Sequence, residues 1–165
     1  MRYRELETIL PQLIARGIHV QVVTSAVREI PKSWASLPNL SIVVSIDGLQ
    51  PEHDVRRKPA TYERILKHIA GHQITVHCTI TSQMLWSPGY LERFVSQWSA
   101  TDATKRIWMS IFTPQIGEHP IEALTSEQRE RVISELLRLR GRYPKLDLAE
   151  ATRSEERRVG KECRL

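Results

Sequence analysis

The sequence predicts an α/β fold built on a parallel sheet. Short segments rich in Val and Ile alternate with longer segments whose apolar residues recur at helical spacing. The run at 40–46 is apolar nearly throughout, as in a parallel strand covered on both faces. A length of 165 residues, with 41% apolar and 26% charged residues, suits one globular domain. Strands that alternate with helices form βα units, so a parallel sheet or a barrel is expected.

The first half of the chain is expected to begin and end with a helix. The predicted elements are a helix at 2–16, strands at 18–24 and 40–46, a turn or short helix at 31–37, and a helix at 59–70. Gly17 and Gly71 follow the two helices, in the place where a glycine C-cap is common. The polar segment between the strand at 40–46 and the second helix is predicted to be a loop.

The second half continues the alternation. Strands are predicted at 73–80 and 105–112, and helices at 88–98 and 125–140. Pro88 suits the first turn of its helix, since proline needs no backbone partner there. Thr125 or Ser126 is expected to cap the last helix, with Gln128 in its first turn. The connections between parallel strands are expected to be right-handed.

Composition excludes several classes of protein. No apolar run approaches the roughly 18 residues of a membrane span, and the charged start lacks a signal peptide's apolar stretch. Two cysteines cannot build a disulfide framework, so a cytoplasmic location is expected. The net charge of +5 is not gathered into a basic stripe with aromatics, so no nucleic-acid partner is favoured. Packing roles are expected for Trp86, Trp98 and Trp108, which lie in separate elements.

The segment 45–57, SIDGLQPEHDVRR, is the best candidate for a binding site. It follows an apolar strand, and open α/β sheets and barrels bind ligands at the carboxyl ends of their strands. The Ser45 hydroxyl and the Arg57 guanidinium are suited to hold a carboxylate, and Gly48 lets a backbone approach a ligand. Taken singly, Ser45 and Asp47 suit an ordinary polar turn, and the basic residues 56–58 suit a solvated loop.

The pattern Ser-Ile-Asp-Gly, then His-Asp, then an arginine twelve residues after the serine, resembles the radical S-adenosylmethionine (radical SAM) enzymes. It is similar to their fourth core strand and the following loop, and the likeness covers roughly 18–112. The resemblance implies a partial (β/α)6 barrel, similar to a TIM barrel. It also implies a [4Fe–4S] cluster that cleaves S-adenosylmethionine to a 5′-deoxyadenosyl radical, which takes hydrogen from a substrate.

The resemblance also implies roles for individual residues. Ser45 and Arg57 match positions that hold the methionine carboxylate of S-adenosylmethionine, with Arg56 as the alternative if the loop shifts by one residue. Other matching positions are the strand-end turn at Asp47 and Gly48, and the arginine-positioning pair His53 and Asp54. The remaining matches are Thr24 after an earlier strand, where the family's Thr-Asn-Gly is incomplete, and Thr79 and Thr81 as lining of the ribose or substrate cavity.

Two family motifs are absent from the chain. These are the cluster motif CxxxCxxC and the Gly-Gly-Glu-Pro-type turn, and Cys78 alone cannot ligate a cluster. The resemblance therefore implies an internal fragment, over 1–150, with about four of six core strands. Such a fragment is expected to be inactive alone. The intact parent, an oxidoreductase or transferase, would take electrons from a donor such as flavodoxin or ferredoxin and act on an unidentified small molecule or peptide.

The last segment, 151–165, differs from the rest of the chain. It is dense in charge and has no apolar period. Residues 153–163 resemble the in-frame translation of a DNA-sequencing adapter, so this tail is expected to be an artefact that makes no core contacts.

Two other functions stay open. A non-enzymatic α/β module could use Ser45 and Arg57 for another carboxylate, a phosphate or a nucleotide. A basic nucleic-acid-associated protein is the second alternative, and its affinity would have to fall steeply with salt.

Overall fold

The computed structural model describes residues 3–118 and 120–148; the predictions for 151–165 lie outside these ranges. The described strands are β1 (Val20–Thr24), β2 (Leu40–Ser45), β3 (Ile74–Ile80), β4 (Thr104–Ile111) and β5 (Leu146–Asp147). The described α-helices are α1 (Tyr3–Ala15), α2 (Glu52–Arg57), α3 (Tyr62–Ile69), α4 (Tyr90–Ala100) and α5 (Ser126–Arg142). Two 3-10 helices, η1 (Lys32–Ser36) and η2 (Ser82–Trp86), complete the described elements.

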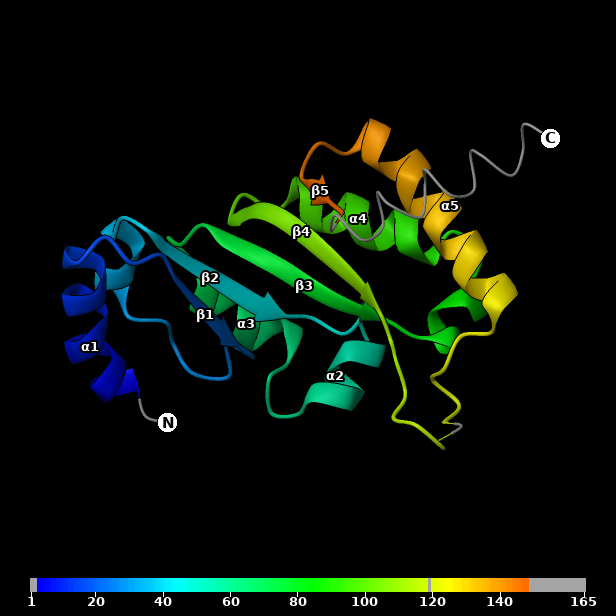
Figure 1. Cartoon of the computed structure of the whole chain (residues 1–165), viewed down its shortest axis with the longest axis horizontal. Helices are drawn as coiled ribbons and strands as arrows, with labels where there is room; N and C mark the ends of the chain where they lie inside the picture. Colours follow the sequence, from blue (N-terminus) through cyan, green and yellow to red (C-terminus); the bar gives the residue numbers. More distant parts are fainter. Residues whose placement is uncertain (1–2, 119, 149–165) are drawn as a thin grey trace.

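The strands form one parallel sheet in the order β1-β2-β3-β4-β5 (Figure 1). This confirms the predicted α/β class and parallel sheet. The order never reverses, unlike that of a doubly wound sheet, and is compatible with part of an α/β barrel. The predicted count of four strands is too low, because β5 also pairs with β4. At two residues, β5 is too short to produce a recognisable period.

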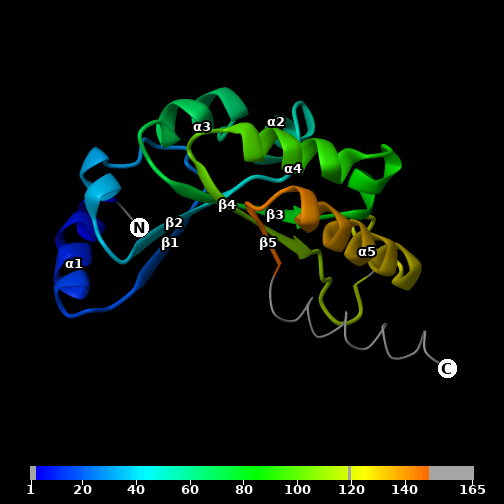
Figure 2. The same ribbon diagram turned by 90° about the horizontal axis from the view of Figure 1, so that it is seen from above.

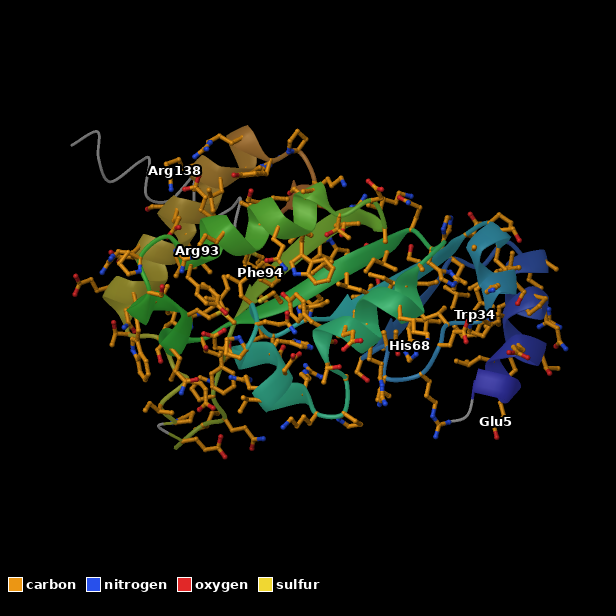
Figure 3. The ribbon with its side chains drawn as sticks, turned by 180° about the vertical axis from the view of Figure 1, so that it is seen from behind. Glu5, Trp34, His68, Arg93, Phe94 and Arg138 are labelled. Carbon is orange, nitrogen blue, oxygen red and sulfur yellow. The ribbon has the colours of Figure 1, made fainter. Side chains whose placement is uncertain are left out.

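The two faces of the sheet differ in character. Side chains along β3 alternate between fully buried and half-buried, and its buried set, which includes Cys78, belongs to the apolar core. Figure 2 shows α3 and α4 above one face of the sheet, while none of the described helices covers the opposite face. Phe94 of α4 is fully buried between that helix and the strands (Figure 3). We call the uncovered side the open face.

The ends of two helices bear on the predictions. A capping box begins α5, because the Thr125 hydroxyl accepts from the Gln128 N–H and the Gln128 side chain accepts from the Thr125 N–H. This confirms Thr125 as the cap. The expectation that Pro88 opens a helix is wrong, since α4 begins at Tyr90. Gly89, with a φ of +68°, turns the chain into that helix.

The loop predicted after the second strand contains a helix, α2. Glu52 and Asp54 lie in its first turn, and Arg56 and Arg57 lie in its last. This charge order complements the helix dipole, which stabilises so short a helix. The helix escaped prediction because its six residues do not complete two turns of apolar periodicity.

None of the helices formed by residues 3–118 and 120–148 is both long enough and apolar enough to cross a membrane.

Candidate functional site

The segment 45–57 lies at the carboxyl end of the sheet, as predicted. Ser45 is the last residue of β2 and pairs in register with His77 of β3. The chain then turns through Asp47 and Gly48 into α2, which lies beyond the strand ends (Figure 1). The strand therefore delivers the polar residues of the segment to the edge where α/β folds bind ligands.

An ion pair joins the two ends of the segment. Arg57 donates from Nε to Asp47 Oδ2 at 2.7 Å and from Nη2 to Asp47 Oδ1 at 3.2 Å. The Asp47 side chain is only 10% exposed, and that of Arg57 is 35% exposed. Because a guanidinium carries five N–H donors, this contact fixes the arginine without using all of them. Arg56 approaches the same carboxylate less closely, at 3.8 Å.

His53 holds the turn from inside. Its ring is fully buried, its Nδ1 accepts from the Asp47 N–H at 2.9 Å, and its Nε2 lies 2.9 Å from the Ala60 carbonyl. These two bonds require the neutral tautomer with the proton on Nε2. Burial lowers the pKa of His53 below its usual value, against opposing effects of the Ala60 carbonyl and nearby carboxylates. The neutral imidazole thus ties the start of the turn to the segment that follows α2.

Gly48 lies in a close-packed corner. The Tyr62 hydroxyl donates to its carbonyl at 2.6 Å, and Trp98 Nε1 donates to the Tyr62 oxygen at 3.0 Å. The Tyr90 hydroxyl accepts from the Leu49 N–H at 2.7 Å. A Cβ on Gly48 would lie 2.6 Å from the Tyr90 oxygen, and its φ of +123° is unfavourable for any other residue. Glycine is therefore required here.

Asp54 connects α2 to α3. Its Oδ1 accepts from the Tyr62 N–H and its Oδ2 accepts from Gln50 Nε2, both at 2.7 Å. Both bonds lower the pKa of Asp54, and the bond from Gln50 has the larger effect. Tyr62 is the first residue of α3, so the Asp54 carboxylate lies at the N-terminus of that helix, where the helix dipole favours a negative charge. His53 and Asp54 thus both hold α2, which carries the arginine, in place.

The open face carries the polar residues of β2 and β3. Ser45, His77 and Thr79 are half-buried and alternate with core residues, so they lie on this face. His77 Nε2 lies 3.1 Å from Ser110 Oγ on β4. Burial is the main cause that lowers the pKa of His77. The structure therefore brings Ser45 and Thr79 onto one polar surface, next to the edge formed by Asp47 and Gly48.

Thr24 is not part of this surface. It pairs in register with Val44, a core residue on the helix-covered side, and its Oγ1 accepts from the Ala26 N–H at 3.1 Å. His68 of α3 also reaches this turn, with its Nδ1 2.8 Å from the Ala26 carbonyl (Figure 3). The structure thus separates Thr24 from Ser45, although both end neighbouring strands.

A pocket of about 350 Å³ opens beside the segment, between α2 and η2–α4. The sequence indicated Asp47, Arg56 and Thr81 as site residues. The other lining residues were not expected as site residues: Glu52, Gln83, Met84, Trp86, Ser87 and Tyr90. The packing role predicted for Trp86 is wrong, because 67% of it is exposed, whereas Trp98 is buried as predicted. An isolated tryptophan carries no signal in the sequence that separates a core position from a pocket rim.

Compared with known proteins, the chain matches no family model, no curated protein and no solved structure. Among the described residues, no group of three or more His, Cys, Asp or Glu side chains is placed to hold a metal ion. Cys78 is fully buried in the core, and burial raises the pKa of its thiol.

Proposed function

We propose that this chain is part of a radical SAM enzyme and that the carboxyl edge of its sheet binds S-adenosylmethionine. In this proposal the five strands belong to a partial (β/α)6 barrel whose interior is the open face. The observation that carries the proposal is the arrangement of 45–57: a serine on the open face at a strand end, and an arginine bonded to Asp47, two residues after that serine. The unbroken strand order also supports the barrel.

The residues present suit the methionyl end of S-adenosylmethionine. Arg57 keeps donors that Asp47 does not use, and Ser45 adds a hydroxyl. A hydroxyl and a fixed cation can together hold a carboxylate by charge-assisted hydrogen bonds. Thr79, on the open face one strand away, is assigned to the ribose or substrate cavity. Bound S-adenosylmethionine supplies radical chemistry when a reduced iron–sulfur cluster stands beside it.

The described residues do not suit the cluster itself. Thiolates are its ligands, and the buried Cys78 thiol faces the core, away from the open face. We therefore assign this chain only the binding and orientation of S-adenosylmethionine. Cluster ligation, the flavodoxin or ferredoxin donor and the identity of the substrate belong to the proposed parent protein, and the chain alone is expected to be inactive.

Binding measurements test the assignment directly. Isothermal titration calorimetry would compare S-adenosylmethionine with 5′-methylthioadenosine, which keeps the nucleoside and lacks the carboxylate. We expect tighter binding of S-adenosylmethionine and a loss of about tenfold or more in Ser45→Ala, the value of one hydrogen bond to a charged group. The binding of 5′-methylthioadenosine should not change in this variant. Ser41→Ala, on the same strand and face but away from its carboxyl end, is the matched control.

Two results would contradict the proposal. Equal affinity for the two nucleosides would mean that no carboxylate is recognised. If inorganic phosphate binds as tightly as S-adenosylmethionine and displaces it, a general anion-binding module is favoured instead, since the fixed Arg57 suits either ligand.

A further inference from the structure

The pocket between α2 and η2–α4 has a charged wall and an apolar wall. Glu52 and Arg56 lie one turn apart on α2, and both line the pocket. Met84 and Tyr90 form the opposite wall, with Trp86 beside them. A volume of about 350 Å³ is at the lower end of the range for small-molecule sites. The pocket therefore suits a small ligand with a charged end and an apolar end.

The charged wall presents both signs of charge. The Glu52 carboxylate makes no hydrogen bond or ion pair with any described residue. Arg56 has only its 3.8 Å approach to Asp47, whose carboxylate already takes two hydrogen bonds from Arg57. One carboxylate and one guanidinium are thus available one helical turn apart. Such a pair matches a ligand that carries an ammonium and a carboxylate together.

The apolar wall contains a tryptophan, Trp86, that is unusually exposed to solvent. Met84 and Tyr90 are 6% and 7% exposed, whereas 67% of Trp86 is exposed. A tryptophan normally buries most of its large surface, so its exposure beside a formed cavity marks a place for a ligand to cover it. Aromatic rings and thioethers pack well on tryptophan and methionine.

We propose that this pocket binds a small zwitterion of the α-amino-acid type with an aromatic or thioether side chain. Glu52 receives the ammonium, Arg56 receives the carboxylate, and Trp86 and Met84 pack on the side chain. The site is distinct from the one proposed for S-adenosylmethionine at Ser45 and Arg57, because neither of those residues lines the pocket. Asp47 lines the pocket and also holds Arg57, so the test below follows the binding of S-adenosylmethionine beside that of the pocket's own ligand.

Titration calorimetry and tryptophan fluorescence on the full chain test this proposal with L-phenylalanine as probe. Two analogues divide its charges: phenethylamine lacks the carboxylate, and 3-phenylpropionate lacks the ammonium. We expect saturable binding of L-phenylalanine and about tenfold weaker binding of each analogue, the value of one charge-assisted hydrogen bond. Glu52→Gln should remove the advantage over 3-phenylpropionate, and Arg56→Gln the advantage over phenethylamine. Glu63→Gln, an exposed change on α3, is the matched control.

The fluorescence change should disappear in Trp86→Phe while the calorimetric signal persists, since a phenylalanine ring still packs on the ligand. The proposal is overturned if L-phenylalanine gives no saturable heat in the folded chain, or if both analogues bind as tightly as L-phenylalanine. It is also overturned if Glu52→Gln weakens S-adenosylmethionine and L-phenylalanine does not compete, because the pocket would then belong to the S-adenosylmethionine site.

Discussion

Replacement of His53 by alanine tests the structural basis of the candidate site. The His53 ring is fully buried and bonds at 2.9 Å to both the Asp47 N–H and the Ala60 carbonyl. Among the described residues, no other side chain forms a hydrogen bond with the Asp47 N–H or the Ala60 carbonyl. His53→Ala therefore removes the link between the turn after β2 and the segment after α2.

The cost of this change follows from the two groups left behind. Asp47 is 8% exposed and Ala60 is 2% exposed, so water has little access to either. An unsatisfied buried polar group costs about 1–3 kcal/mol, which gives about 2–6 kcal/mol for the pair. A cavity in place of the imidazole adds to the loss. This is a large part of the roughly 5–15 kcal/mol that stabilises a typical domain.

Urea unfolding followed by tryptophan fluorescence and far-ultraviolet circular dichroism measures the loss. We expect a free energy of unfolding lower by at least about 2 kcal/mol in His53→Ala. His19→Ala is the control, since His19 is exposed and surface substitutions usually stay within about 0.5 kcal/mol. If His53→Ala changes the free energy of unfolding by no more than about 0.5 kcal/mol, the reasoning is refuted, because the two bonds would then contribute nothing.

Four further predictions concern stability, pH and thiol reactivity. Gly48→Ala should cost about 1–3 kcal/mol or more in urea unfolding, because of its φ of +123° and the tyrosine hydroxyl in the way of a Cβ. Gly141→Ala, in a helix with open space, should stabilise by up to about 1 kcal/mol. Because the pKa of His53 is lowered from 6.5, the unfolded chain takes up the proton first. The free energy of unfolding should thus fall as pH drops below about 6.5, less steeply in His53→Ala; equal slopes would contradict this. In a Cys163→Ser chain, Cys78 should react with Ellman's reagent only after unfolding, and rapid reaction of the native chain would show that it is not buried.

The sequence predicted the class of the fold because the long elements carry strong periods. The run at 40–46 and the alternating side chains of 73–80 identify two central strands, and both are found within one or two residues of the expected bounds. The cap at Thr125 was readable because a capping box needs only residues close in sequence. Patterns of this local kind survive tertiary packing.

Features that depend on distant contacts could not be predicted. The turn before α2 is held by Tyr90, 41 residues away in sequence from its partner Leu49, and no local pattern reveals that bond. Thr24 and Ser45 end neighbouring strands, yet strand register puts them on opposite faces. The exposure of Trp86 likewise depends on how η2 packs against α4, since a single aromatic residue has no period.

Sequencing genomic DNA across the locus, upstream of the codon for Met1, tests the central proposal most directly. We predict an open reading frame that continues upstream and encodes CxxxCxxC ahead of this chain, because radical SAM chemistry requires thiolate ligands that the chain lacks. An in-frame stop codon shortly upstream, with no such motif before it, would contradict the proposal and leave Ser45 and Arg57 as a general anion site.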